Sequence, residues 1–278
     1  MITISIIGCG WFGLPLAKEL LARGYRVKGS KRNPEGVTQL RRQGILASRL
    51  DLAYPELLTD CPELFDTDNI LINIPPSRGQ DPGSDPYLAQ LKTLQQRLSE
   101  RNYRRLIFIS STGVYAPGTR LDEGSPLSDS PGAHRLIQAE QLFAALPNAC
   151  IVRFAGLMGP ERHPGRFLSG KKSLPSGQNS VNMLHLDDAI GGVCALLEYS
   201  KPLPGNCYNL CPPHHPTREA FYTRASQLLG VPLPKFAAQG SKDQDRVIDG
   251  SRICRELNYR YQIRDPLQAL PDLTVAAP

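Results

Sequence analysis

Residues 2–13 read ITISIIGCGWFG, an alternating apolar run that ends in a G-x-G-x-x-G motif. A helical pattern follows over residues 11–23 and stops at Gly24, and residues 25–29 have the composition of a second strand. A glycine motif placed between a strand and a helix is typical of a dinucleotide-binding βαβ unit. This context, more than the glycines alone, predicts a dinucleotide site.

The three glycines of the motif have separate tasks in such a turn. Gly8 permits the tight bend, Gly10 lets a pyrophosphate approach the backbone, and Gly13 lets the helix lie close to the strand. The helix N-terminus adds backbone N–H groups and a partial positive charge. We therefore expect the phosphates to bind at this turn.

The end of the second strand indicates which cofactor is preferred. An NAD site places an acidic side chain there, but this chain has Ser30, Lys31 and Arg32, and the first acidic residue after them is Glu35. Bases and hydroxyls bind a 2′-phosphate, whereas a carboxylate repels it. The sequence thus favours NADP(H) over NAD(H); the alternative is that Lys31 and Arg32 are only a solvated strand end.

Strand and helix patterns alternate over the first half of the chain. Continuous apolar strands divided by amphipathic helices are typical of a parallel sheet covered on both faces. We predict an α/β fold with a doubly wound parallel sheet. Strands are expected at residues 45–50, 70–74, 106–109 and 150–154, and helices at residues 87–101 and 134–146.

The pattern changes after residue 155, where Gly and Pro become frequent. We predict a Rossmann domain over residues 1–155. Residues 156–278 are expected to hold the remaining sheet elements and a small substrate lobe. The elements expected there are helices at 186–199, 217–229 and 253–257 and a strand at 208–210.

Composition narrows the class of protein. The 278 residues are 41% hydrophobic and 21% charged, which is typical of a globular chain. The net charge of +6 comes from bases spread along the chain, without a nucleic-acid motif, so we expect no nucleic-acid partner. No apolar run approaches the ~20 residues that cross a bilayer, and Met1 leads directly into a strand, so we expect neither membrane span nor signal peptide.

The seven cysteines are an odd number without a C-x-x-C pair, which favours free thiols in a reducing, cytoplasmic compartment. Cys207, Cys211, His214 and His215 gather in a Pro-rich loop. A zinc site is the alternative there, but the spacing matches no familiar ligand set, and we predict none.

Motifs along almost the whole chain resemble one family. Residues 107–115 read IFISSTGVY, and later segments include Arg153 with Gly159-Pro160, His185 with Asp188, and Tyr208-Asn209. In this order they resemble the extended short-chain dehydrogenase/reductase superfamily, of the epimerase/dehydratase type. GWFGLPLA at 10–17, HPGRF at 163–167 and IDGSRIC at 248–254 resemble its atypical, YeeZ-like branch.

The resemblance implies a Ser, a Tyr and a Lys four residues after the Tyr as the catalytic groups. Ser111 stands at the serine position, but counting back from Glu140 places Gly132 and Leu136 at the Tyr and Lys positions. Neither Gly nor Leu can transfer a proton. His134 and Tyr115 are the candidate substitutes; the alternatives are a surface histidine, a packing tyrosine and a serine that only satisfies backbone groups.

The resemblance also assigns binding residues. Gly8, Gly10 and Gly13 would wrap the pyrophosphate with the N–H groups of Trp11 and Phe12 pointing inward, and Ser30, Lys31 and Arg32 would take the adenosine phosphate. The adenine contact would be Asp51 and Leu52, the ribose contact Ile74 and Pro75, and the substrate contacts Arg166 and His185. Arg166 is otherwise a surface arginine, and His185 otherwise caps the helix that follows it.

These features predict an NADP(H)-binding oxidoreductase-like or epimerase-like protein that acts on a carbonyl or sugar-type small molecule. Ser111 would orient the substrate oxygen, and His134 or water would supply the proton. The alternative is a non-catalytic NADP-binding sensor or regulator. The resemblance further implies a homodimer formed through the helices at 87–101 and 134–146.

Overall fold

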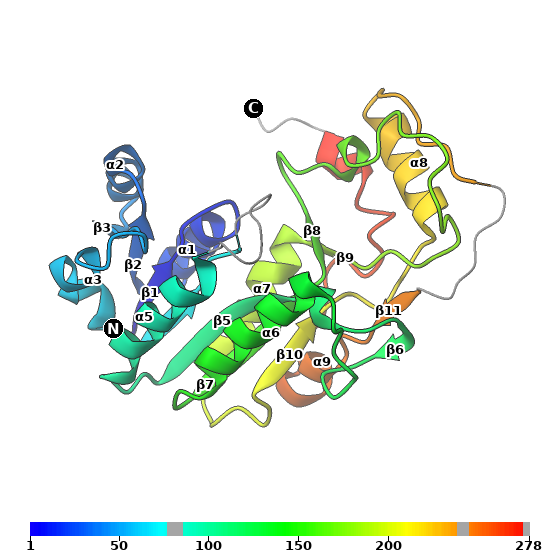
Figure 1. Cartoon of the computed structure of the whole chain (residues 1–278). Helices are drawn as coiled ribbons and strands as arrows, with labels where there is room; N and C mark the ends of the chain where they lie inside the picture. Colours follow the sequence, from blue (N-terminus) through cyan, green and yellow to red (C-terminus); the bar gives the residue numbers. More distant parts are fainter. Residues whose placement is uncertain (77–85, 238–244, 275–278) are drawn as a thin grey trace. The chain divides into compact units, whose positions relative to one another are not determined.

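The computed structural model describes residues 1–76, 86–237 and 245–274 (Figure 1). The chain divides into two compact units and passes between them several times. Unit 1 comprises Met1–Ser110, Asp129–Val152 and Val193–Cys207, and unit 2 comprises Ser111–Ser128, Arg153–Gly192 and Tyr208–Pro278. The division of the chain at residue 155 stays a prediction.

The elements of unit 1 alternate between strand and helix, as the sequence predicts. In chain order they are β1 (Thr3–Ile7), α1 (Gly13–Ala22), β2 (Arg26–Lys31), α2 (Pro34–Arg42), β3 (Leu46–Arg49), α3 (Leu57–Asp60), α4 (Pro62–Phe65), β4 (Asn69–Ile72), α5 (Tyr87–Ser99), β5 (Arg105–Ser111), α6 (Pro131–Ala144) and β7 (Ala149–Phe154).

The remaining elements complete the chain. They are η1 (Thr112–Val114), β6 (Gly118–Leu121), β8 (Gly156–Met158), η2 (Pro164–Arg166), β9 (Met183–His185), α7 (Leu186–Glu198), β10 (Cys207–Leu210), α8 (Arg218–Leu228), β11 (Arg246–Ile248), α9 (Arg252–Leu257) and η3 (Pro271–Thr274). Among these described residues, no helix is both long and apolar enough to span a membrane.

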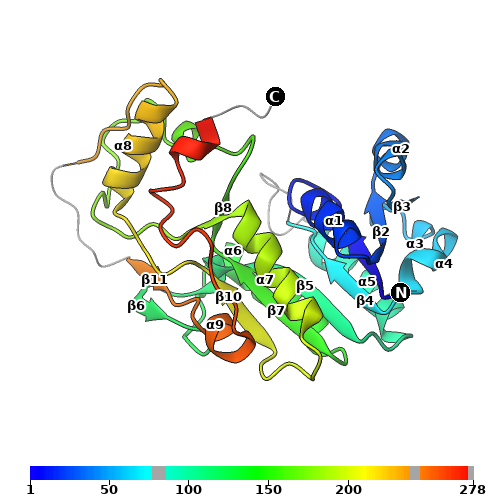
Figure 2. The same cartoon turned by 180° about the vertical axis from the view of Figure 1, so that it is seen from behind.

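The central sheet has seven strands in the order β10-β7-β5-β4-β1-β2-β3. β1 pairs in parallel with both β2 and β4, and β2–β3 and β4–β5 are also parallel. Figures 1 and 2 show α5 and α6 on one face of this sheet and α1 on the opposite face. The prediction of a doubly wound parallel sheet is confirmed.

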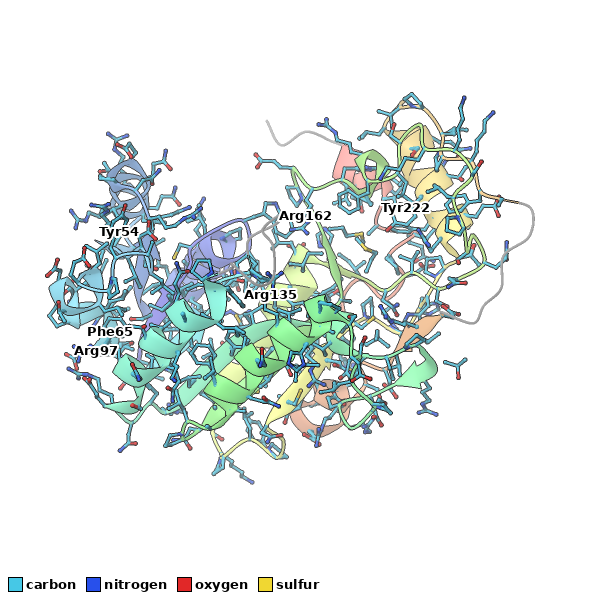
Figure 3. All side chains as sticks on the ribbon, viewed as in Figure 1. Tyr54, Phe65, Arg97, Arg135, Arg162 and Tyr222 are labelled. Atoms are coloured by element: carbon cyan, nitrogen blue, oxygen red, sulfur yellow. The ribbon has the colours of Figure 1, made fainter. Side chains whose placement is uncertain are left out.

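The core of unit 1 packs α5 and α6 onto the apolar strands. The rings of Phe108 on β5 and Phe143 on α6 stack with their centroids 4.6 Å apart, and both are fully buried. Burying a side chain of this size stabilises the fold by about 1.5–3 kcal/mol. On α5, the Arg97 guanidinium lies 5.5 Å from the centre of the Phe65 ring and forms a cation–π contact with it (Figure 3).

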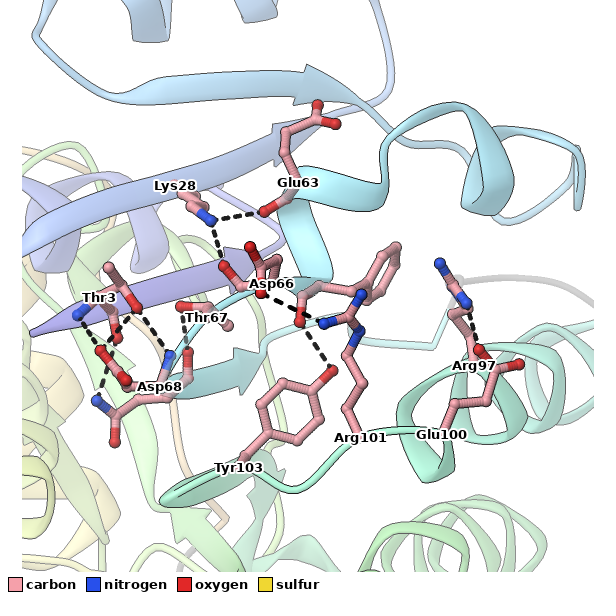
Figure 4. Close-up of polar contacts among 12 residues, drawn as sticks. Thr3, Lys28, Glu63, Asp66, Thr67, Asp68, Arg97, Glu100, Arg101 and Tyr103 are labelled. Atoms are coloured by element: carbon pink, nitrogen blue, oxygen red, sulfur yellow. Dashed lines mark hydrogen bonds and ion pairs between the residues drawn. The ribbon is translucent and has the colours of Figure 1, made fainter.

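A network of polar contacts fixes α4 and the start of β4 against β1 and β2 (Figure 4). The backbone N–H and hydroxyl of Thr3 donate to Asp68 Oδ2 at 2.7 and 2.8 Å, and Asn69 Nδ2 donates to the Thr3 carbonyl at 3.2 Å. The buried Lys28 ammonium donates to the carbonyls of Glu63, at 2.7 Å, and Asp66. Burial lowers the pKa of Lys28, and the carbonyls offset part of the cost of burying its charge.

Unit 2 contains two small parallel sheets, β6–β11 and β8–β9. Its C-terminal segment is held by the fully buried carboxylate of Asp188, which accepts hydrogen bonds from the Tyr259 hydroxyl at 2.7 Å and from the N–H groups of Gln262 and Ile263 at 2.8 and 2.9 Å. Its apolar core comprises Met158, Val181, Met183, Phe221, Ala225, Ala269 and Leu270.

Several boundaries in unit 1 lie one to three residues from the predicted positions, and two of these shifts have a clear local cause. α6 begins at Pro131 rather than at residue 134, because the Ser130 hydroxyl caps the helix by accepting from the Ala133 N–H and a proline fits the first turn. β2 continues to Lys31 rather than ending at residue 29, because Ser30 and Lys31 still pair with β3. Helix α2, which the Asn33 side chain caps, was not predicted.

Candidate dinucleotide site

The turn after β1 is pressed against the end of β4. Gly8 has φ of +99°, and a Cβ added there would lie 2.3 Å from the Asn73 carbonyl oxygen. The Asn73 N–H donates to the Ile7 carbonyl at 2.8 Å, and its side-chain amide donates to the Gly8 carbonyl at 3.3 Å. The conformation and the contact each require glycine at position 8.

The other two glycines of the motif differ from each other. A Cβ on Gly13 would lie 2.5 Å from the Gly8 carbonyl oxygen and 3.2 Å from Ile6 Cγ2, so this glycine lets α1 lie against the strand. A Cβ on Gly10 would meet no heavy atom of the described residues within 4 Å. Gly10 therefore faces open space, as a residue beside a bound phosphate must.

The start of α1 suits an anion. The side chain of the N-cap residue Phe12 makes no capping hydrogen bond to this ten-residue helix, and the first turn of the helix has no acidic residue. Trp11 is half-buried and Phe12 is buried just before it. Burial raises the pKa of the neighbouring Cys9 thiol to about 11, so no thiolate charge opposes a phosphate here. Helix N-termini of this kind stabilise negative charge.

Ser30 lies beneath the turn rather than on its rim. Its hydroxyl accepts a hydrogen bond from the Gly8 N–H at 3.0 Å, its carbonyl accepts from the Cys9 N–H at 3.2 Å, and its exposure is 3%. In this position Ser30 supports the glycine turn. The sequence predicted that Ser30 contacts the adenosine phosphate; its support of the turn was not predicted.

Three bases meet at the ends of β2 and β3. Lys31 pairs in register with Arg49, and Arg49 Nε donates to the Arg32 carbonyl at 3.1 Å. Arg32 and Arg49 are exposed and Lys31 is half-buried. Sequence reasoning found Lys31 and Arg32 but missed Arg49, whose signal was its position two residues before Asp51 at the end of the third strand.

The remaining predicted cofactor contacts lie at the ends of β3 and β4. Asp51 accepts a hydrogen bond from the Ala53 N–H at 3.1 Å, and Leu52 packs partly against the core. The Ile74 carbonyl accepts from the Tyr87 hydroxyl at 3.0 Å, and Pro75 is exposed. Unit 1 thus brings all the predicted cofactor residues to the carboxyl ends of neighbouring parallel strands, where ligands bind in open α/β sheets.

A sequence relative matches almost the whole chain. Protein YeeZ of Escherichia coli strain K12 is 40% identical over 272 residues, which cover 95% of this chain and 97% of that protein. The chain belongs to the YeeZ family. No family model matches it. A 3-diazoavenalumate denitrifying reductase from a Streptomyces species is similar at 28% identity over 258 residues, which cover 81% of each chain.

Solved structures show the same fold as this YeeZ-family chain at low identity. A short-chain dehydrogenase/reductase superfamily protein from Agrobacterium tumefaciens, with bound NAD, has a TM-score of 0.78 at 17% identity, covering 98% of this chain and 96% of that one. The UDP-glucose 4-epimerase of Thermotoga maritima, with UDP-glucose, has a TM-score of 0.78 at 14% identity, covering 99% and 97%. The predicted YeeZ-like branch is confirmed by the sequence relative, and the solved structures confirm the predicted fold.

Two of the predicted catalytic residues of this YeeZ-family chain lie in unit 2. The half-buried Ser111 accepts a hydrogen bond from the Gly113 N–H at 3.1 Å and so caps η1. Tyr115 is fully buried: its hydroxyl donates to Asn209 Oδ1 at 2.7 Å and accepts from Arg153 Nη1 at 2.7 Å. The Arg153 guanidinium also lies 4.9 Å from the ring centre. Tyr115 is thus placed as a packing residue, the alternative that the sequence left open.

The third predicted catalytic residue lies on α6. His134 is exposed in the first turn, and its N–H donates to the Ser130 carbonyl at 2.9 Å. At Gly132, where the resemblance implies a tyrosine, an added Cβ would meet no described atom within 4 Å, and Leu136, where it implies a lysine, is half-buried. Within this helix, Glu140 is buried and accepts from the Ser110 hydroxyl at 2.6 Å.

The predicted substrate contacts also lie in unit 2. Arg166 is exposed at the end of η2. His185 is buried, and its Nδ1 accepts from the Asp187 N–H at 3.2 Å, so it caps the start of α7 as the alternative interpretation holds. All seven cysteines are free thiols, and the described residues contain no cluster of three or more His, Cys, Asp or Glu able to hold a metal.

Proposed function

We propose that this YeeZ-family chain binds NADP(H) at the glycine turn of unit 1. The observation that carries the proposal is the contrast among the glycines: Gly8 and Gly13 are required by packing, whereas among the described residues Gly10 leaves space beside a helix start that has no acidic residue. The similar protein of Agrobacterium tumefaciens carries bound NAD, which supports a nicotinamide cofactor for this fold. Gly10 and the first turn of α1 would hold the pyrophosphate.

The preference for NADP(H) rests on the three bases at the ends of β2 and β3. Arg32 and Arg49 are exposed cations joined through Arg32's carbonyl, and Lys31 lies beside them. A guanidinium pair matches the geometry and the charge of a 2′-phosphate. Ser30 is left out of this group because its hydroxyl supports the turn.

We propose an oxidoreductase activity on a carbonyl or sugar-type small molecule. The cofactor supplies or accepts the hydride when bound. Ser111 would orient the substrate oxygen, and His134 or a water molecule would supply the proton, because Tyr115 has no exposed surface to offer. Arg166 would pair with an anionic part of the substrate. The reductase relative from Streptomyces supports a reduction as the direction to test first.

The second candidate is a sensor or regulator that binds NADP without turnover. Gly132 and Leu136 favour it, since they occupy the positions at which the family carries its Tyr and Lys and neither can transfer a proton. The intact glycine turn is required by both candidates, so cofactor binding alone does not separate them.

The first experiment is a fluorescence titration of the purified protein with NADPH and, separately, with NADH. We expect NADPH to bind more tightly, and Arg32→Asp and Arg49→Asp to reverse or abolish this preference. Arg42→Asp is the matched control, because Arg42 is exposed at the end of α2 and away from this cluster. An unchanged NADPH preference in both Arg32→Asp and Arg49→Asp would refute the 2′-phosphate assignment.

The second experiment separates the enzyme from the sensor. NADPH oxidation is followed at saturating cofactor with a panel of carbonyl compounds and nucleotide sugars. Turnover that Ser111→Ala abolishes supports the enzyme, and full turnover in His134→Ala assigns the proton to water. Tight NADPH binding without turnover of any panel member supports the sensor.

We further propose a cytoplasmic homodimer that uses α5 and α6. These helices pack on each other, and a groove of about 490 Å³ between them is lined by Leu88, Ala89, Leu142 and Ala145 together with Lys92 and three glutamines. Seven free cysteines support a reducing compartment. Sedimentation of the wild type and of Leu142→Arg tests the dimer: a shift of the variant to a monomer supports it, and a monomeric wild type refutes it.

A further inference from the structure

A second cavity lies wholly within unit 2. Its volume is about 740 Å³, and its walls come from β6, β11, the start of α9, the loop after β10 and the segment that follows α9. Pockets for small molecules measure roughly 300–1,000 Å³, so this one has the size for a metabolite. None of the residues that line it belongs to the dinucleotide site.

The cavity carries more positive than negative charge. Arg120, Arg260 and Arg264 line it, and the Arg120 guanidinium is 3.4 Å from Asp249 Oδ2. Arg260 and Arg264 are exposed, and within the part of the chain that the structure describes neither guanidinium has a hydrogen bond or an ion pair. Two guanidinium groups without carboxylate partners favour an anion, which they can bind through paired hydrogen bonds.

One ring nitrogen of a histidine on the same wall lacks a hydrogen-bond partner among the described residues. Nδ1 of His215 is buried and has no hydrogen-bond partner among the described residues. Burial lowers the pKa of this imidazole, so it is neutral near pH 7 and its nitrogens include an acceptor. The imidazole lines the cavity, so a hydroxyl or N–H group of a bound ligand would lie beside it.

The floor of the cavity is rigid. The buried Tyr261 hydroxyl donates to the Gly250 carbonyl at 3.0 Å and accepts from the Cys211 N–H at 3.1 Å. A Cβ on Gly250 would lie 2.2 Å from the Cys211 carbonyl oxygen, so the two backbones are in direct contact. Walls held in this way need little reorganisation when a ligand binds.

We propose that this cavity is a binding site for a small organic anion. A phosphate or carboxylate group of the ligand would pair with Arg260 and Arg264, and a hydroxyl or N–H of its body would bond to His215. The apolar surface of Val247 and Ile248 would contact the rest of the molecule. Since no lining residue lies in unit 1, this ligand would bind in addition to the dinucleotide.

The test uses citrate and glycerol 3-phosphate as probes, a carboxylate and a phosphate that both carry hydroxyls. Their affinities are measured by calorimetry at constant ionic strength for the full chain and for the double variant R260E/R264E. The matched control is R26E/R224E, which makes the same change in charge at two exposed arginines outside the cavity. We expect at least one probe to bind, at least tenfold weaker binding to R260E/R264E, and unchanged binding to the control.

Location is checked by NMR of the histidine rings, since the chain has five histidines and H215N assigns the signal. The His215 signal is expected to shift with the probe in the wild type and in Gly10→Val, but not in R260E/R264E. The proposal is overturned if neither probe binds, if R260E/R264E binds as the wild type does, or if excess NADPH or Gly10→Val abolishes the binding. The last result would place the probes in the dinucleotide site.

Discussion

The two ends of β1 and β4 use their polar groups in opposite ways. At the amino end, the side chains of Thr3, Asp68 and Asn69 bond to one another and to the backbone. At the carboxyl end, the side chains of Ser30 and Asn73 form hydrogen bonds to the backbone of Gly8 in the glycine turn. A Cβ on Gly10, in the same turn, would meet no described atom within 4 Å. The polar groups at the amino end thus bond to one another, whereas those at the carboxyl end support the turn at which we propose that the dinucleotide binds.

Gly8→Val should have the largest effect, because it disrupts the glycine turn that packs against the end of β4. A valine there would need a positive φ and would place its Cβ 2.3 Å from the Asn73 carbonyl oxygen. We expect a loss of about 3 kcal/mol or more in the free energy of unfolding, measured by urea denaturation. A stability equal to that of the wild type would contradict the described turn.

Gly10→Val should separate binding from folding at the same turn. Its added side chain enters open space, so the melting temperature should stay within about 2 °C of the wild type. NADPH affinity should fall by roughly a hundredfold or more, about 2.7 kcal/mol, because the side chain occupies the place of the pyrophosphate. Titration and melting are measured on the same sample, and retained affinity would refute the site.

Lys28→Met tests the polar contacts that hold α4 against β2 (Figure 4). The variant leaves the carbonyls of Glu63 and Asp66 without their ammonium donor, and a lost partner of this kind costs about 1–3 kcal/mol. Urea denaturation should report this loss while NADPH affinity stays unchanged. Arg26→Met, an exposed change on the same strand, should alter stability by no more than about 0.5 kcal/mol. Equal effects of the two changes would show that the ammonium contacts contribute little.

The sequence was sufficient for features that depend on local order. The glycine turn, the alternation of strands and helices and the bases after β2 all follow from residues that are neighbours in the chain. The parallel sheet could be predicted for the same reason, since buried strands divided by helices leave few other arrangements.

Features that depend on distant partners could not be predicted. Tyr115 follows a strand in the sequence, but its hydroxyl is held by Arg153 and Asn209, 38 and 94 residues away. Arg49 lies beside Lys31 only because of the register in which β3 pairs with β2. Ser30 faces the turn because of where β1 lies, which the composition of β2 does not reveal.

Asp68→Asn should have the smallest effect and should depend on pH. The Thr3 N–H, and after it the Thr3 hydroxyl, hold the pKa of the Asp68 carboxyl below its ordinary value. A carboxylate with a lowered folded-state pKa adds stability above the unfolded-state pKa, near about 3.9, and loses it as the pH falls through the lower folded value. Because Asp68 is exposed, we expect the variant to be less stable by about 1 kcal/mol or less at pH 7, and the difference to shrink towards pH 2. Urea denaturation across this range measures it, with the exposed Asp60→Asn as control; a difference that grows on acidification would show that the charged form of Asp68 does not stabilise the amino end of β1 and β4.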